Sequence, residues 1–472
     1  MSLITEPLGL YGWKDREAVV LASLLSEEPL LLVGGHGCAK SFILERLAQS
    51  LGLEFRFYNA SLINYDDLVG IPMPNKARTS LDYIASENSI WDAQVVFFDE
   101  INRTRPDLQN KLFPIIHEKR IQGRPLERLV FRWAAMNPPS LDDDTDQSYT
   151  TDYLGAEPLD PALADRFPFI MDVPAWDDLD EADQRRILVD QFAGRHEFPL
   201  AIDVLMRAAK ERFQMLVKTE SERLSSFVIV LVAKLHEAHF DVSTRRACIL
   251  LRVILAVHAA RQTLAAYRSE ADEVQLRDSV FLAVRSALPD RARRPVRDVE
   301  IAAVCKAAWS VAAIPQDDPV RSLLLVSDPM VRLEKAVRAK DALPPHHLAT
   351  IVGEGVAAAR PVLRRGLALA VYLALRERAD LPATTIELLV NEIKDAILPS
   401  SHHASVPMAR AAIPRTVGAQ IAAVAAESGA DSELASYHAN LLNSLLPDGY
   451  ATGKDVKEVS DEFVRLWREF SL

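Results

Sequence analysis

LLLVGGHGCAKSF, residues 30–42, places a glycine-rich turn between a short apolar run and a segment with helical spacing. In that context the N–H groups of the turn and the N-terminus of the helix converge on one point and can bind a phosphate. The usual pattern G-x-x-x-x-G-K-[ST] has one departure here, because Ala39 takes the place of the last glycine. A residue as small as alanine still fits where the loop enters the helix. The stretch therefore predicts a strand, a phosphate-binding loop and a helix, in that order.

The residue types of this loop suit an anionic ligand and a metal ion. Lys40 is expected to neutralise charge on the outer phosphates, and Ser41 is expected to offer its hydroxyl to magnesium. Taken alone, the same letters would also suit an ordinary glycine-rich turn between a strand and a helix. The expected ligand-binding residues of the loop are Gly34, Gly35, His36, Gly37, Cys38, Ala39, Lys40, Ser41 and Phe42.

An acidic pair follows a second apolar run, VVFF at 95–98, which ends in Asp99 and Glu100. A buried strand would deliver both acids to the carboxyl edge of a parallel sheet, where ligands of open α/β sheets bind. Asp99 is expected to hold magnesium, directly or through water, and Glu100 to orient and polarise the water that attacks the terminal phosphate. An acidic pair that caps a solvated strand is the alternative, and the phosphate-binding loop on an earlier strand argues against it.

Strand and helix patterns alternate over the first 175 or so residues, which is the form of a parallel sheet wrapped by helices. After Pro174 the strand signals nearly vanish, and the apolar run at 227–232 is predicted to be buried helix. An α/β domain followed by helical domains is therefore expected. The five predicted strands are 30–33, 54–58, 95–98, 129–136 and 169–173, and the two predicted helices between them are at about 40–51 and 106–118.

The length and composition indicate a globular protein of more than one domain. A chain of 472 residues is too long for one hydrophobic core, since single cores stop growing near about 250–300 residues. Hydrophobic residues make up 49% and charged residues 25%, which is the balance of a protein that buries a core.

The net charge indicates the class of partner, and the cysteines indicate the redox state of the compartment. The formal net charge of −12 disfavours broad electrostatic capture of nucleic acid, so a protein or peptide is the better default partner. The 3 cysteines have neither a paired framework nor zinc-ligand spacing, which fits a reducing cytoplasm. The N-terminal residues lack the pattern of a signal peptide, and no apolar stretch is expected to reach the ~18–20 residues that a spanning helix needs, so membrane insertion is not expected.

With both motifs present, GGHGCAKS and VVFFDEINR, the chain resembles the MoxR branch of AAA+ ATPases, a clade with an insertion in helix 2. The loop of that branch also carries alanine before the lysine, and its acidic strand continues into Ile-Asn-Arg. The resemblance covers roughly residues 10–255. It implies an AAA+ P-loop αβα sandwich with a five-stranded parallel sheet at 1–175, a helical lid at 176–267 and an additional all-helical domain of unknown role at 268–472.

The resemblance also gives expected roles to residues outside the two motifs. Asn137 stands where the sensor-1 residue of the family ends its strand and touches the attacking water or the γ-phosphate. Arg166 is similar to the arginine that reaches the nucleotide of the neighbouring subunit. The alternatives are an ordinary turn at Asn137 and a surface ion pair of Arg166 with Asp160 or Asp165.

Two further segments match the family pattern. Ser243-Thr244-Arg245 is similar to the sensor-2 segment of the lid, where Arg245 or the adjacent Arg246 would serve. Tyr11 and Gly12 resemble the segment that lies against the adenine. The segments 59–94 and 119–128 match the helix-2 insertion and the hairpin before sensor 1. The expected catalytic residues are thus Glu100, Asn137, Arg166 and Arg245, and the expected metal ligands are Ser41 and Asp99.

For function, the resemblance implies ATP hydrolysis with Mg²⁺ in an oligomeric ring, with a hexamer as the family expectation. Hydrolysis would be coupled to the remodelling or assembly of a protein client, in this family often a von Willebrand factor A-domain protein. Two alternatives stay open. One is a scaffold that nucleotide binding assembles, and the other is a nucleic-acid motor or defence component that uses GTP. No N-K-x-D motif for guanine follows the loop, so ATP is preferred.

Overall fold

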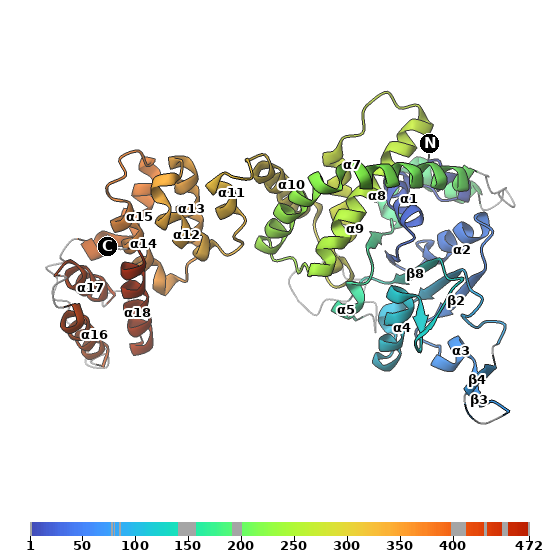
Figure 1. Cartoon of the computed structure of the whole chain (residues 1–472), viewed down its shortest axis with the longest axis horizontal. Coiled ribbons are helices and arrows are strands. Elements are labelled where there is room, and N and C mark those ends of the chain that lie inside the picture. The colour runs from blue at the N-terminus through green and yellow to red at the C-terminus, as the bar shows by residue number, and fades with distance from the viewer. Residues whose placement is uncertain are drawn as a thin grey trace. The chain divides into compact units, whose positions relative to one another are not determined.

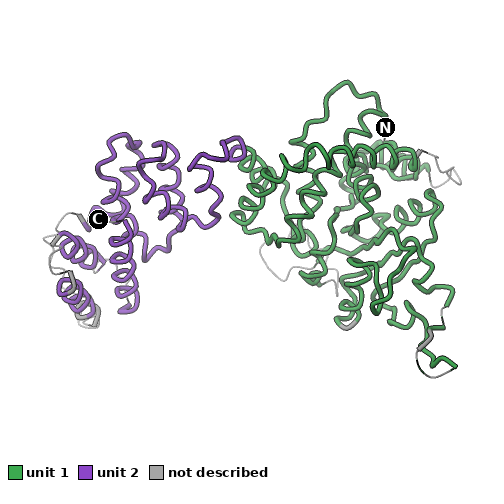
Figure 2. Tube along the Cα trace, in the orientation of Figure 1, with its two compact units in different colours: residues 1–309 green, residues 310–472 purple. Residues whose placement is uncertain are grey.

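The structure is a computed structural model that describes residues 2–76, 79, 81–84, 86–139, 157–190, 201–397, 412–428, 432–445 and 452–470. The chain forms two compact units, unit 1 (Met1–Trp309) and unit 2 (Ser310–Leu472), which Figure 2 colours separately. The boundaries predicted at 175 and 267 both fall inside unit 1. The division of unit 1 into a sandwich and a lid therefore stays a prediction.

A five-stranded parallel sheet lies at the centre of unit 1, with the strand order β2-β5-β8-β1-β9 (Figure 1). Each strand lies within two residues of its predicted range at both ends. The register places Leu31 of β1 opposite Ala134 of β8 and Ile170 of β9. Short apolar runs form the inner strands because a parallel sheet is buried on both faces. The strands are β1 (Leu30–Val33), β2 (Phe55–Asn59), β5 (Val95–Asp99), β8 (Phe131–Met136) and β9 (Phe169–Asp172).

Helices cover both faces of this sheet, as the αβα prediction requires. α4 (Pro106–Glu118) packs Leu112 and Ile116 into a buried cluster with Val96 of β5 and Met136 of β8. Val96 and Met136 share one face because alternate strand residues point to opposite sides. On the other side of the sheet lie α2 (Lys40–Ser50), which contacts β2, β5 and β8, and α1 (Glu17–Ser26), which contacts β9 (Figure 1).

Long helices follow the sheet in unit 1, and the run 227–232 lies in one of them, α7, as predicted. α8 packs against α1, α7 and α9. Within the described residues, α8 is also the one helix that is long and apolar enough to cross a membrane, but 61% of its apolar window is buried inside the structure. The helices are α6 (Glu181–Asp190), α7 (Ala201–Glu237), α8 (Thr244–Arg268), α9 (Leu276–Ala287) and α10 (Asp298–Ala312).

Short elements complete unit 1. They include two hairpins, which fall in the segments 59–94 and 119–128 that the resemblance singled out. The short elements are η1 (Glu6–Leu8), η2 (Lys14–Arg16), α3 (Tyr65–Val69), β3 (Ile71–Pro74), β4 (Leu81–Ile84), η3 (Ile101–Arg103), β6 (Arg120–Ile121), β7 (Arg124–Pro125), α5 (Pro161–Ala164), η4 (Trp176–Asp178) and η5 (Pro289–Ala292).

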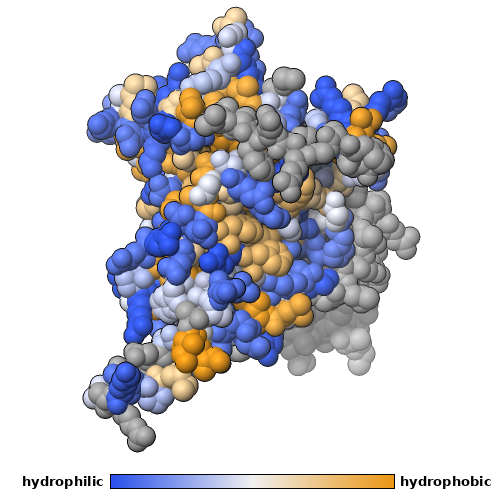
Figure 3. Space-filling view, turned by 90° about the vertical axis from the view of Figure 1, so that its right-hand side faces the viewer, coloured by the Kyte–Doolittle hydropathy of each residue, from blue (hydrophilic) through white to orange (hydrophobic). Residues whose placement is uncertain are grey.

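The hairpin of β3 and β4 has an unusual distribution of apolar side chains. Ile71 and Ile84 are direct partners on the two strands, and both side chains are about three-fifths exposed, at 62% and 61%. Tyr83 lies on the other face of the ribbon and packs its ring against Trp91. Figure 3 shows the side of the molecule that is on the right in Figure 1. In this view, apolar side chains gather just above the part of the molecule that projects at the lower left. The ribbon therefore presents apolar residues to solvent on the face that does not contact Trp91.

Unit 2 is built from helices, with no strand among its described residues. Four of them, α11 to α14, begin on a proline, which suits the first helical position, and Asp318 and Asp328 cap the first two of these helices. The helices are α11 (Pro319–Leu324), α12 (Pro329–Arg338), η6 (Lys340–Ala342), α13 (Pro345–Ala358), α14 (Pro361–Leu375), α15 (Ala383–Ile397), α16 (Ala412–Ser428), α17 (Ser432–Ser444) and α18 (Gly453–Glu469).

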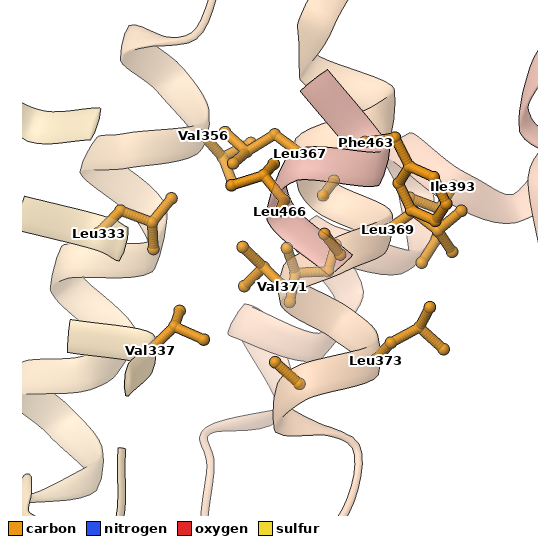
Figure 4. Close-up of a cluster of buried hydrophobic side chains, with 14 of the residues drawn as sticks. Leu333, Val337, Val356, Leu367, Leu369, Val371, Leu373, Ile393, Phe463 and Leu466 are labelled. Atoms are coloured by element: carbon orange, nitrogen blue, oxygen red, sulfur yellow. The ribbon is translucent and has the colours of Figure 1, made fainter. Parts of the chain in front are cut away.

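One buried cluster joins the helices of unit 2 (Figure 4). Leu333 of α12, Leu369 of α14 and Phe463 of α18 are all fully buried in it. These residues come from positions up to 130 residues apart (463 − 333), so the unit has a hydrophobic core of its own. The predicted all-helical character of the C-terminal region is confirmed.

His438 of α17 is a buried histidine in unit 2. Its Nε2 lies 2.8 Å from Ser460 Oγ. Burial lowers the pKa of His438 to about 4, whereas an unfolded chain would give it a pKa of about 6.5. Between these values the unfolded chain binds a proton that the folded chain does not bind.

We expect this difference to make the stability of unit 2 depend on pH. The free energy of unfolding is unaffected by the protonation of His438 above about pH 6.5. As the pH falls from there toward 4, protonation of the unfolded chain lowers this free energy by a total of about 3 kcal/mol. His438→Gln does not titrate and should remove this part of the pH dependence. Urea unfolding of the full chain at about pH 7.5 and about pH 5, followed by hydrogen exchange of α17, measures the effect. Equal pH slopes for the two proteins would contradict it.

Candidate functional site

The predicted phosphate-binding loop connects β1 to α2. Ala39 is the N-cap of α2 and has φ +59°, a left-handed conformation that glycine adopts most readily. This backbone explains why glycine is usual at that position, and a small side chain is tolerated there. A Cβ atom on Gly34 would lie 2.9 Å from Cβ of Val173, which follows β9. Gly34 therefore allows the loop to pass close to the neighbouring strand.

Lys40 begins α2 and turns its ammonium group back over the loop. Its Nζ donates to the carbonyl oxygens of Gly34 and Gly35, both at 2.7 Å, and to Asn137 Oδ1 at 3.1 Å. All three acceptors are neutral. The side chain is only 9% exposed, and burial lowers the pKa of Lys40 although Asp99 acts in the opposite direction. A buried ammonium group with neutral acceptors keeps a positive charge that an anionic ligand can offset.

The acidic pair ends β5 beside this loop. Ser41 Oγ donates to Asp99 Oδ2 at 3.0 Å, so the hydroxyl and the carboxylate predicted to hold magnesium are in contact. Glu100 has a left-handed backbone with φ +54°, which is strained for a residue other than glycine. Its carboxylate accepts a hydrogen bond from Ser61 Oγ at 3.1 Å and pairs with Arg103 at 3.4 Å. The two carboxylates therefore have different partners and can take different roles.

Asn137 follows β8, which lies between β5 and β1 in the sheet, and its side chain contacts the loop. Its Oδ1 accepts from Lys40, and its Nδ2 lies 3.5 Å from His36 Nε2. Asn102 Nδ2 donates to the carbonyl oxygens of Asn137 at 3.3 Å and Glu157 at 3.0 Å, which holds the end of β8 in place. The loop, the acids and Asn137 thus meet at the carboxyl edge of the adjacent strands β1, β8 and β5.

A cavity of about 560 Å³ lies beside the loop, within the usual size of a small-molecule pocket. Its lining includes Tyr11 from the predicted adenine segment, Phe42 of α2, and Trp176 and Leu179 from the region after β9. Gly12 has φ +75°, and a Cβ atom there would lie 2.2 Å from Leu179 Cδ2. Tyr11 therefore faces the cavity, while Gly12 supports its wall.

Arg166 and Arg245 lie together, apart from this cluster. The guanidinium of Arg166 lies over the ring of Phe113, 4.4 Å from its centroid, and Arg245 Nη1 lies 3.8 Å from Asp165 Oδ2. Burial, and then the charge of Arg245, lowers the pKa of Arg166. Asp165 precedes the amino end of β9, whereas Lys40 follows the carboxyl end of the parallel strand β1. The length of a strand, about 13 Å, therefore separates the two arginines from the loop of the same chain.

The two candidates for the sensor-2 arginine differ sharply in exposure. Arg246 is fully buried, and its guanidinium donates to Asp165 and to main-chain carbonyl oxygens. The Arg245 side chain is 44% exposed. Of this pair, Arg245 is the arginine that a ligand or a neighbouring molecule can reach.

Sequence reasoning missed two parts of the site. Ser61, which bonds Glu100, comes two residues after β2 and so belongs to the same sheet edge, a position that could have drawn attention to it. Trp176 and Leu179 lie beyond the last strand, in a segment with no recognisable motif. Only the packing of that segment over Tyr11 and Gly12 reveals its part in the cavity.

Comparison with known proteins gives a family match over the residues that carry most of this site. Residues 29–167 match the family model described as AAA domain (dynein-related subfamily). The chain is 29% identical over 175 residues to structural protein ORF618 of Acidianus two-tailed virus, which covers 34% of this chain and 26% of that protein. It is 27% identical over 166 residues to the uncharacterized protein YeaC of Bacillus subtilis, which covers 34% of this chain and 47% of that protein. The chain thus spans about a quarter and just under half of these two relatives.

A solved structure gives a weaker likeness. A candidate ATPase from Cytophaga hutchinsonii matches 60% of this chain and 92% of its own, with 19% identity and a TM-score of 0.40. The family match agrees with the strand order and with the predicted AAA+ fold. Residues 29–167 have the αβα fold of the AAA domain that they match, and membership of the MoxR branch stays a proposal.

Gly12→Ala should disturb the cavity wall. The new Cβ atom would meet Leu179 in a left-handed backbone, so we expect a loss of about 1–3 kcal/mol in the free energy of unfolding. Gly52→Ala is the matched control, because Gly52 also has positive φ but a Cβ atom there meets nothing within 4 Å. Denaturant unfolding measures both variants, and an equal loss in the two would contradict a packing role for Gly12.

Proposed function

We propose that unit 1 binds ATP with Mg²⁺ at the carboxyl edge of its sheet and hydrolyses it. The observation that carries this proposal is the buried ammonium group of Lys40, whose three described partners are all neutral oxygens. Phosphoryl transfer needs charge placed around the phosphates more than covalent chemistry from the protein. The AAA domain match over residues 29–167 supports ATP as the ligand.

Ser41 and Asp99 suit a magnesium ion. Their oxygen atoms lie 3.0 Å apart, and hydroxyl and carboxylate oxygens are the hard ligands that Mg²⁺ prefers. Within the described residues no three acidic, histidine or cysteine side chains form a complete metal cage. This fits an ion that takes one carboxylate from the protein and the rest of its ligands from phosphates and water. A bound Mg²⁺ would neutralise charge that develops on the phosphates.

Glu100 is the proposed residue for the attacking water. Glu100 comes one residue after Asp99, and its carboxylate is held by Ser61 and Arg103. From this position Glu100 orients the water and accepts its proton. Asn137, bonded to Lys40, would touch the same water or the γ-phosphate. The cavity lined by Tyr11 would take the adenine.

The ATP site is proposed to be shared between copies of the chain. Arg166 and Arg245 lie at the sheet edge opposite Lys40, so neither can serve the nucleotide of its own chain without a large rearrangement. Supplied by a neighbour, both would stabilise charge on the γ-phosphate, in the manner of an arginine finger. A head-to-tail contact of this kind closes into a ring. We therefore propose an oligomeric ring, for which the family expectation is a hexamer.

The proposed work of the ring is to remodel or assemble a partner protein. Groups from two chains around one γ-phosphate would shift relative to each other when that phosphate is lost. A MoxR-like chaperone ATPase acting on a von Willebrand factor A-domain client fits this scheme. The description of the viral relative as a structural protein favours the second candidate, a scaffold that nucleotide binding assembles.

Lys40→Ala should weaken ATP binding at least about tenfold, because it removes a charge-assisted contact worth about 1.5–3 kcal/mol. The fold should persist, since Lys40 bonds only carbonyl groups of its own loop and Asn137. Calorimetric titration with ATP and Mg²⁺ measures the change. Lys210→Ala, which removes a surface ion pair with Glu27, is the matched control. Unchanged affinity in Lys40→Ala would exclude this loop as the phosphate site.

Glu100→Gln should keep ATP binding and lower the turnover number about 10²-fold or more, because the water loses its proton acceptor. Steady-state phosphate release and nucleotide binding measure the two properties separately. Hydrolysis at the wild-type rate would refute the assignment. If Glu100→Gln supports the cellular function while Lys40→Ala abolishes it, the scaffold is the better description. A pull-down with Glu100→Gln and ATP would then identify the partner in either case.

A further inference from the structure

Arg246 is bonded on every side although it contacts no part of the Lys40 cluster. Its Nε donates to Asp165 Oδ1 at 3.1 Å. Its Nη1 donates to the carbonyl oxygens of Phe167 at 3.0 Å and Ala287 at 2.9 Å, and its Nη2 to that of Ala164 at 3.2 Å. One guanidinium from the first turn of α8 thus ties residues 164–167 to the end of α9.

Two of the bonded carbonyl groups are helix ends. Ala164 is the last residue of α5, and Ala287 is the last residue of α9. Carbonyl oxygens at a helix C-terminus lack partners in their own helix and carry partial negative charge, so a cation that bonds them stabilises the end. α5 is only four residues long, and so short a helix cannot hold its own end rigidly. The position of residues 164–167 therefore depends on Arg246.

Arg166 lies within the segment that Arg246 holds. Arg246 bonds the residues on both sides of it, and Ser243 Oγ holds Asp165 Oδ2 from a third direction at 3.0 Å. Ser243 is the N-cap of α8, and Arg245 stands in the same helical turn as Arg246. A shift in the start of α8 must therefore move Arg166 and Arg245 together.

Electrostatics adds to this coupling. Arg166 and Arg245 are close enough that the charge of Arg245 lowers the pKa of Arg166. Two cations at this separation repel each other unless an anion lies between them. Asp165 is that anion, 3.8 Å from Arg245 and bonded to Arg246. The carboxylate lets two arginines share one small surface.

We propose that Asp165 and Arg246 are positioning residues that present Arg166 and Arg245, as one rigid pair, to the nucleotide of a neighbouring copy. This inference rests on the proposed shared ATP site. Arg246 acts only through Arg166 and Arg245, so its loss should leave the nucleotide pocket of its own chain intact. That expectation separates positioning from a general effect on folding.

Arg246→Lys is the test variant, because lysine keeps the charge but cannot bond four acceptors in a fork. Measured alone, it should bind ATP within about twofold of wild type and hydrolyse it at least about tenfold more slowly. Lys40→Ala has a disabled loop but intact arginines. Mixed in equal amounts, the two proteins should hydrolyse ATP at least about threefold faster than the sum of their separate rates.

Controls make the outcome specific. Arg223→Lys on α7, where Arg223 forms an exposed ion pair with Glu220, is the matched substitution and should match wild type. Arg166→Ala mixed with Lys40→Ala tests the shared site itself. If that mixture recovers activity and the Arg246→Lys mixture does not, the positioning role is wrong. Wild-type turnover by Arg246→Lys alone would also overturn it. If neither mixture recovers, the shared site is wrong and this inference fails with it.

A second variant covers a failure of Arg246→Lys to fold. Asp165→Asn keeps the shape of the side chain and removes the charge between Arg245 and Arg246. The same pattern is expected, with ATP binding retained, slow hydrolysis alone and recovery with Lys40→Ala. Slow hydrolysis without recovery, while Arg166→Ala recovers, would overturn the inference as before.

Discussion

The hydrogen bond from Ser41 to Asp99 crosses an intervening strand, because β8 lies between β1 and β5 in the sheet. The two side chains meet only if all three strands end at the same edge in the observed register. A slip of β5 by one residue would move Asp99 by about 3.3 Å and turn it to the other face of the sheet. Asn137 reaches Lys40 under the same constraint. The apolar packing that sets the register of these strands is therefore also what assembles the site.

Features with a local signal could be predicted from the sequence. The strands at 30–33 and 95–98 are apolar runs that end in polar residues, and such a run specifies both a buried strand and the edge where its last residues lie. Lys40, Ser41 and Asp99 could be identified for this reason. Asn137 was assigned from the family resemblance, which places the sensor-1 residue at the end of the strand predicted at 129–136. The helix at 106–118 was recognisable from its apolar spacing and from Pro106 at its start.

Features that depend on contacts between distant segments could not be predicted. Arg245 and Arg246 are the same residue type at adjacent positions, and one helical step of about 100° decides which of them is buried. That choice requires the carbonyl oxygens of Ala164 and Ala287, on two other segments. Lys40 and Arg166 likewise lie at opposite edges of the sheet because β1 and β9 are parallel. Only the folded chain shows how far apart these two residues are.

The hairpin of β3 and β4 is exposed, and its sequence limits the pairing of β3 with a strand from another molecule. Pro72 and Pro74 lie opposite Tyr83 and Leu81, and proline has no N–H to donate. Within Ile71–Pro74 the two remaining N–H groups therefore point toward β4, and the outer edge of β3 offers acceptors only. A strand from another molecule cannot form a ladder along that edge. The face with Ile71 and Ile84 stays exposed, so another molecule can contact its side chains. The outer edge of β3 does not allow the ribbon to add a further strand and grow into an amyloid-like sheet.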